Sequence, residues 1–344
     1  MQLCNFSFKK INLHYFLLFF SCWAFLTFLN LHFLIDNEYA KMFFDAQSSG
    51  IANSISKMNF TKDPTYFLLQ NISATFIEFK VFFGALILLC LMLKFTALLQ
   101  VNAKPNLLDV APYFLVLAFL HEGIQIRIAI ALSIALWSII FFVKKRFLFS
   151  VLLLIIASSF HITASTFFLV YFLVFLYSNY GKWVIGGGLF ITALLASTPI
   201  IRNLVLKMGE LTNARFLSYS GNDFIKIQNS TGLFEFYIFF VGLLTIFIWK
   251  FYIPTNVFWQ RLRQIAIASG LLAMAILQVF QFSVVISSRL ADLLLLPVLL
   301  VLGATLSQLM NEKRYWLLFG TVLFLLIYCF VRSYISFHPG SKFL

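Results

Sequence analysis

Long apolar runs follow one another along the whole chain, separated by short polar or basic segments. The runs are continuous, which excludes a membrane β-barrel because barrel strands alternate apolar and polar residues. Backbone groups in lipid are otherwise satisfied only within helices, and about 20 apolar residues cross the hydrocarbon core. We therefore predict an all-α, polytopic membrane protein of about ten to eleven transmembrane helices. The predicted spans are 11–35, 81–100, 107–121, 124–143, 147–160, 162–178, 184–200, 233–249, 265–286, 290–309 and 315–331.

The stretch 147–178 is too long for one comfortable span and too short for two full ones. At 1.5 Å per residue, its first helix covers only about 21 Å. We predict short paired helices here, meeting near His161. Because the chain shows no internal repeat and no linker, we predict that residues 1–344 form a single integral membrane domain. We expect the first span to stay uncleaved, and we predict outer loops at 36–80 and 201–232. Basic residues beside short loops place Lys144 and its neighbours in the cytoplasm.

Composition supports a lipid environment. Hydrophobic residues make up 62% of the chain and charged residues 11%, whereas a soluble domain carries roughly a quarter charged residues. The 25 Lys and Arg exceed the 12 Asp and Glu, which gives a net charge of +13. Basic cytoplasmic loops explain this excess, and no extramembrane segment interleaves bases with aromatics, so nucleic acid is not an expected partner. The four cysteines show neither zinc spacing nor a disulfide framework.

Ionisable residues near membrane helix ends are costly and mark candidate sites. On the predicted topology, several gather at the outer ends of spans: Asp36, Glu38, His121, Glu122, Arg127, His161, Arg289 and Asp292. Structural explanations exist for each. Arg289 and Asp292 are three residues apart and can pair with one another. Arg127 can neutralise Glu122 or extend to the interface, and His161 can belong to a satisfied polar turn.

Two arginines and a histidine at the outer surface suit a particular chemistry. The planar guanidinium grips phosphate oxygens in pairs and keeps its charge. Such groups fit the pyrophosphate of a polyprenyl lipid and the charge that develops when that pyrophosphate leaves. A histidine or carboxylate can take the proton from an attacking hydroxyl. This set fits glycosyl transfer from a lipid pyrophosphate.

Three segments resemble the EpsG/Wzy-type polysaccharide (O-antigen) polymerases. The segment 122–171 carries an R-x-x-x-A helix at Arg127 and Ala131, a basic turn at 144–146, and the F-H pair Phe160-His161 before small residues. Two further stretches fit: DNEYAKMFFDA with DPTYFLL looks like the family's first outer loop, and SSRLADLLLLPVLL looks like its late arginine-led helix.

The resemblance implies a glycosyltransferase of the bacterial inner membrane that joins undecaprenyl-pyrophosphate-linked oligosaccharide units at the periplasmic or exterior face. The transfer is expected to be inverting and to need no cofactor and no metal, and a chain-length regulator is a candidate further partner. By this resemblance Arg127 and Arg289 hold the donor pyrophosphate, and His161 or Glu122 is the base. The remaining candidates for binding substrate are His121, Asp36, Tyr39 and Arg215, the last in the basic loop 201–232.

Other readings stay open at this point. Asp36 and Glu38 follow the first span directly, as in metal-dependent lipid-phosphate-sugar transferases, and that reading predicts loss of activity with a chelator. A flippase or exporter for lipid-linked glycans also places charges in membrane helices, but such transporters often show internal repeats. A membrane acyltransferase is a further alternative.

Overall fold

The computed structural model describes residues 13–29, 37–49, 63–101, 107–118, 125–180, 187, 231–280 and 284–337. Within these ranges every regular element is a helix, which confirms the predicted all-α class. The helices are α1 Leu13–Leu29, α2 Asn37–Ser49, α4 Pro64–Ala74, α5 Phe79–Val101, α6 Leu107–Tyr113 with the π-helical η2 Phe114–Ala118, α8 Ile126–Val143, α9 Phe147–Phe160, the 3-10 turn η3 Ile162–Ser165, α10 Thr166–Tyr180, α15 Thr231–Phe251, α16 Val257–Val279, α17 Val284–Asn311 and α18 Tyr315–Phe337.

Four of these segments are long and apolar enough to cross a membrane: α5, α8, α16 and the part of α17 from Ser287 to Asn311. Six shorter apolar helical segments accompany them, in α1, α6–η2, α9, η3–α10, α15 and α18. The prediction of a polytopic membrane protein is thus confirmed. The predicted span 184–200 lies outside the described residues apart from position 187.

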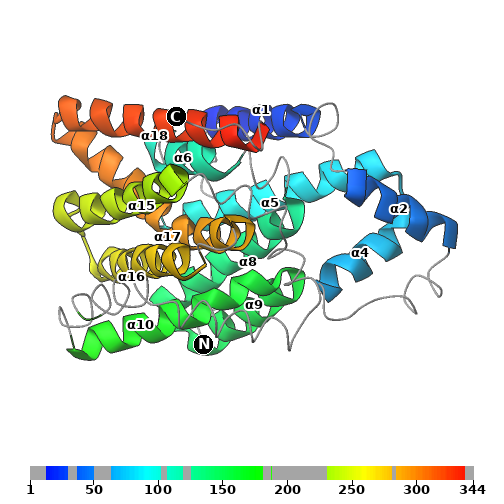
Figure 1. Cartoon of the computed structure of the whole chain (residues 1–344), viewed down its shortest axis with the longest axis horizontal. Helices are drawn as coiled ribbons and strands as arrows, with labels where there is room; N and C mark the ends of the chain where they lie inside the picture. Colours follow the sequence, from blue (N-terminus) through cyan, green and yellow to red (C-terminus); the bar gives the residue numbers. More distant parts are fainter. Residues whose placement is uncertain are drawn as a thin grey trace.

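The long helices lie side by side, and α2 and α4 lie beyond one end of the bundle (Figure 1). α17 is the most enclosed of the four long segments, because every residue from 291 to 303 is buried. α9 lies at the periphery and buries only Ser150, Leu154 and Ala157. Its exposed apolar side chains, and those of α18, are suited to contact with lipid.

Contacts between helix ends show how α8, α15, α16 and α17 run relative to one another. Arg261, at the start of α16, donates through Nη1 to the carbonyl oxygen of Val143 at the end of α8, at 3.0 Å. Ile253, just after α15, donates to Oε1 of Gln308 in the last turns of α17, at 3.2 Å. The opposite end therefore carries the first residues of α8 and α17 and the turn after α9. We call this the α4 end.

The predicted pair of short helices in 147–178 is confirmed. α9 ends at Phe160, and His161 takes an extended backbone conformation (φ −156°, ψ 119°). Its N–H still donates to the Ala157 carbonyl and its carbonyl accepts from the Ala164 N–H, both at 3.0 Å. His161 thus joins α9 to η3 with its backbone groups satisfied, and its side chain stands at the helix junction.

The structure corrects one predicted span and adds elements to another segment. α16 begins at Val257 and ends at Val279, so the predicted span 265–286 started too late and ended too late. Arg261 and Arg263, which the predicted spans left in the connection between two helices, both lie inside α16 and donate to carbonyls at the ends of α8 and α15. The predicted outer loop 36–80 contains two helices, α2 and α4.

Candidate functional site

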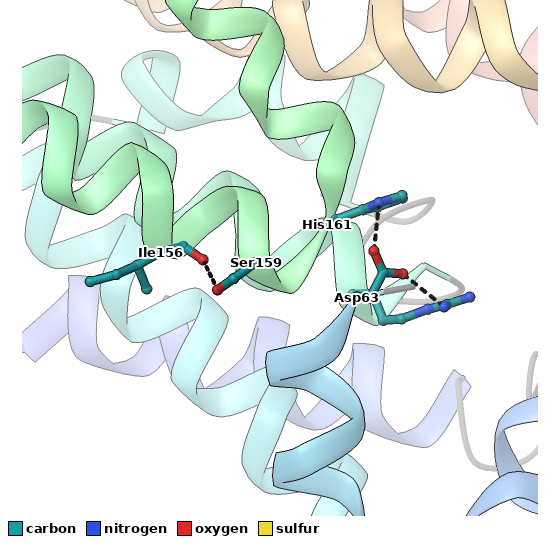
Figure 2. A network of polar contacts seen from close by, with 5 residues as sticks. Asp63, Ile156, Ser159 and His161 are labelled. Carbon is teal, nitrogen blue, oxygen red and sulfur yellow. Dashed lines mark hydrogen bonds and ion pairs between the residues drawn. The ribbon is translucent and has the colours of Figure 1, made fainter. Parts of the chain in front are cut away.

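Asp63, the residue before α4, joins two side chains that are far away in sequence. Its Oδ2 lies 2.8 Å from Nη1 of Arg127, at the start of α8. Its Oδ1 lies 3.3 Å from Nδ1 of His161, between α9 and η3. Figure 2 shows the Asp63 carboxylate directed toward His161. We call Asp63, Arg127 and His161 the trio.

Local backbone geometry directs the carboxylate of Asp63. Pro64 occupies the first turn of α4, where its missing N–H costs nothing. Asp63 itself is in the left-handed region (φ 46°, ψ 55°), which Asp and Asn tolerate better than other residues with a side chain. Because the side chain of Asp63 makes no cap bond to α4, its oxygens are directed to Arg127 and His161 instead.

The trio is largely shielded from solvent, with side-chain exposures of 8% for Asp63, 18% for Arg127 and 15% for His161. Burial by itself raises the pKa of the Asp63 carboxyl. The hydrogen bond and charge of His161, the charge of Arg127 and the Ile162 N–H outweigh burial and hold that pKa below its ordinary value. Asp63 is therefore an anion at neutral pH.

Arg127 is held from a second side by aromatic rings of α4. Its guanidinium carbon lies 5.9 Å from the ring centre of Tyr66 and 5.8 Å from that of Phe67. Cation–π contacts of this kind favour a fixed guanidinium at a site of low polarity. Arg127 thus presents its planar set of N–H donors in an orientation set by α4.

A short polar chain fastens α4 to α9 beside the trio. The Thr65 hydroxyl donates to Oγ of Ser159 at 2.7 Å, and Ser159 donates to the carbonyl of Ile156 at 2.7 Å. The second of these bonds is drawn in Figure 2. α4 therefore rests on the end of α9 through Thr65 and on His161 through Asp63.

Two buried polar atoms next to the trio have no hydrogen-bond partner among the described residues. They are Oε1 of Gln125, which precedes α8, and Oγ1 of Thr163, which lies in η3. Buried polar atoms are nearly always hydrogen-bonded in proteins, so each one that is not requires an explanation. Both atoms flank a member of the trio, two residues from Arg127 and two from His161.

Arg289 lies at the same end of the bundle, on α17, which packs against both α8 and η3. Its side chain is half-buried. Asp292, one turn further along α17, is fully buried and accepts a hydrogen bond from the Tyr237 hydroxyl. The sequence had offered Arg289 alone as a partner for this acid. The structure thus adds Tyr237 of α15 to this part of the α4 end.

Among the predicted site residues, the structure connects Arg127 and His161 through Asp63 and places Arg289 on a helix that packs against η3. Asp36, His121, Glu122 and Arg215 lie outside the described residues, as do the side chains of Glu38 and Tyr39 in α2. Asp63 was not among the predicted site residues. The available signal was its place in DPTYFLL, within a chain that has only 12 acidic residues.

A histidine held by a carboxylate is suited to proton transfer. Because Nδ1 faces Asp63 at 3.3 Å, Nε2 is the ring nitrogen that can take a proton from a substrate. A guanidinium fixed beside it is suited to bind an anion. The trio therefore brings together one side chain that is chemically able to accept a proton and one that is able to stabilise negative charge.

Comparison with known proteins gives one family match. The profile of the EpsG family matches residues 12–344, which is nearly the full chain and includes every member of the trio. No curated protein and no solved structure gives a significant match. The family match supports a general polysaccharide polymerase-type role in a membrane, with activity of the glycosyltransferase kind. On the extent of this match, the chain belongs to the EpsG family.

Proposed function

We propose that the protein polymerises undecaprenyl-pyrophosphate-linked oligosaccharide repeat units, as O-antigen or exopolysaccharide, by inverting and metal-independent glycosyl transfer. The observation that carries this proposal is the trio, in which Asp63 holds His161 and Arg127 at one end of the bundle. The donor is a glycan on a lipid pyrophosphate, and the acceptor is a second lipid-linked unit.

The transfer proceeds in one displacement. An acceptor hydroxyl oxygen attacks the anomeric carbon of the donor sugar, and the bond from this carbon to the pyrophosphate oxygen breaks. The electron pair leaves with the lipid pyrophosphate, and the hydroxyl proton passes to Nε2 of His161. Glu122 stays an alternative base. Because the acceptor enters opposite the leaving group, configuration at the anomeric carbon inverts.

Arg127 and Arg289 have the role of stabilising the departing pyrophosphate. Charge grows on its bridging oxygen as the bond breaks, and fixed guanidinium groups in a site of low polarity stabilise this charge more than water does. Gln125 and Thr163 supply polar atoms without partners among the described residues, which are suited to hydroxyl groups of the sugars. His121, Asp36, Tyr39 and Arg215 remain candidate contacts to the substrate, as the sequence suggested.

We place the α4 end at the exterior face of the bacterial inner membrane. Support comes from the opposite end of the bundle, which carries a large share of the basic residues: Lys144, Lys145, Arg146, Lys250, Arg261, Arg263, Lys313 and Arg314. Short loops rich in Lys and Arg stay in the cytoplasm. The trio then faces the compartment in which, on this proposal, exported lipid-linked repeat units are joined.

Deletion of the gene in its host, followed by complementation, tests this proposal. We expect the deletion strain to lose the ladder of long surface polysaccharide while single repeat units still reach the surface. The wild-type chain and an Arg314→Ala variant, altered at the opposite end, should restore the ladder, and Arg127→Ala should not. Loss of all export would instead indicate a flippase, and loss of activity with a chelator would indicate the metal-dependent reaction of Asp36 and Glu38.

A further inference from the structure

A hollow of about 250 Å³ lies between α5, α8 and α9. All five residues that line it are apolar or aromatic: Leu93, Ile134, Trp137, Phe141 and Leu153. Each of these side chains is half-buried, so the hollow opens at the surface of the bundle. The Trp137 indole N–H donates to the Leu93 carbonyl at 3.0 Å, which uses its polar hydrogen and fixes the ring as one wall.

The hollow lies directly beneath the trio on the same side of α8. Arg127, Ile134 and Phe141 are spaced seven residues apart, and seven residues complete nearly two turns, with a drift of about 20°. Each interval moves about 10 Å along the helix axis. An anionic group bound at Arg127 would therefore have the hollow below it, toward the middle of the membrane.

The wall that α9 provides also lies below the trio. Leu153 in α9 lies eight residues before His161, about 12 Å along the helix axis. α9 packs against both α8 and α4, so α4 lies at the end of α9 beyond the hollow. The polar trio and the apolar hollow thus follow one another along the pair α8 and α9.

We propose that this hollow binds the polyprenyl tail of the lipid-linked donor while the trio binds its pyrophosphate. This inference rests on the proposed function and identifies where the lipid part of the substrate lies. At roughly 30 Å³ for a water-sized group, the hollow holds about eight such groups, which corresponds to one or two isoprene units. Because the hollow begins about 10 Å below Arg127, these are units that follow those next to the pyrophosphate.

Two properties favour the polyprenyl tail over free membrane lipid in the hollow: its shape and its attachment to the bound pyrophosphate. Lipid acyl chains are as apolar as the lining residues, so entry of a tail gains packing contacts rather than hydrophobic free energy. A pyrophosphate held at Arg127 keeps the tail close to the hollow, which raises its effective concentration over that of free membrane lipid. A rigid wall formed by Trp137 and Phe141 then favours a chain of matching width.

Filling the hollow tests the proposal with the purified full-length protein in vesicles. Leu153→Trp places a large ring in the hollow, and Leu152→Trp is the matched control, because Leu152 lies on α9, is exposed and does not line the hollow. Each variant is assayed with two donors that carry the same glycan, one with a full-length polyprenyl tail and one with a ten-carbon tail that ends after two isoprene units.

We expect Leu153→Trp to raise the KM for the full-length donor by about tenfold, because its tail reaches the hollow, and to raise the KM for the ten-carbon donor less, because that tail ends near the upper edge of the hollow. Leu152→Trp should leave KM unchanged. An equal KM for Leu153→Trp and the wild type would overturn the proposal. Thermal unfolding in detergent identifies a variant that fails to fold, in which case the cross-linking measurement below decides.

Photo-cross-linking provides a readout that does not need turnover. A full-length donor with a diazirine in its third isoprene unit should label residues that line the hollow, and unlabelled donor should compete. Labelling of other helices, or equal labelling by a diazirine phospholipid that donor does not displace, would overturn the inference in favour of membrane lipid. If the wild type labels at the hollow but polymerises neither donor, the proposed function fails and the lipid site stands.

Discussion

Replacement of Asp63 by Asn isolates the negative charge of the trio. Asn has nearly the same shape as Asp and also tolerates the left-handed backbone of position 63 (φ 46°). Asp63→Ala would lack this tolerance and would combine strain with the loss of charge. Asp63→Asn therefore removes the anion between Arg127 and His161 and preserves the turn into α4.

The contacts of Asp63 determine how large a loss of rate we expect for Asp63→Asn. Asp63 is 8% exposed and its contacts to Arg127 and His161 are 2.8 Å and 3.3 Å. At an effective dielectric constant of about 20, a unit charge pair at about 4 Å interacts by about 4 kcal/mol. Solvation of the freed guanidinium offsets part of this, so we expect a net loss of about 3 kcal/mol in transition-state stabilisation, or about 100-fold in rate.

The assay is polymerisation of a purified lipid-linked repeat unit in vesicles, with initial rate and product length as readouts. Glu312→Gln is the matched control, because Glu312 pairs with Arg314 at 3.1 Å at the opposite end of the bundle, where both side chains are more exposed. Such surface pairs contribute only about 0–1 kcal/mol. A wild-type rate for Asp63→Asn, at equal protein level, would refute the role of Asp63.

Acid titration checks the charge of Asp63 separately from catalysis. The pKa of its carboxyl is lowered in the folded protein, so folding is stabilised above the unfolded value of about 3.9, and this stabilisation is lost as the pH falls through the lower folded value. The difference in unfolding temperature between the wild type and Asp63→Asn should be constant near neutral pH and decrease below pH of about 4. A difference that does not change with pH would show that the charge of Asp63 is not its source.

Three further outcomes are expected. Arg127→Lys and Arg289→Lys should each lower polymerisation by at least about tenfold, because an ammonium cannot replace the planar fork; wild-type rates in both would exclude the pyrophosphate site. His161→Ala should lose polymerisation while membrane insertion and unfolding temperature are retained, and a lowered unfolding temperature would indicate a structural histidine. Gly303→Ala should destabilise the fold by about 1–3 kcal/mol in a thermal unfolding series, because its new Cβ would lie 2.4 Å from the Asp109 carbonyl oxygen.

The sequence predicted those helices whose bounds are set by the length of an apolar run or by a basic turn. α8 and α9 were located almost to the residue because the basic turn 144–146 interrupts two apolar runs. The junction at His161 followed from the insufficient length of 147–160 for a full crossing. The start of α16 was missed because Arg261 and Arg263 appear as a polar connection, and only the neighbouring helix ends show how their charges are satisfied inside a helix.

Asp63 could not be identified as the centre of the trio from the sequence alone. It lies 64 residues from Arg127 and 98 from His161, and no periodic pattern relates these positions. The sequence suggested Glu122 as the acid nearest to Arg127, since the two are close along the chain. The packing of α4 against α9 brings a distant carboxylate to Arg127, and such a contact depends on tertiary structure.

The trio has features that a purely structural ion pair does not need. Asp63 adopts a left-handed backbone before Pro64, a combination that a chain selected only for stability would replace. Gln125 and Thr163 keep buried polar atoms without partners among the described residues, each of which costs about 1–3 kcal/mol when unsatisfied. An ion pair that served only to fasten α4 would gain from satisfying them. Departures from local stability that gather at one place are typical of a binding site, and here they surround a fixed guanidinium and a histidine held by a carboxylate.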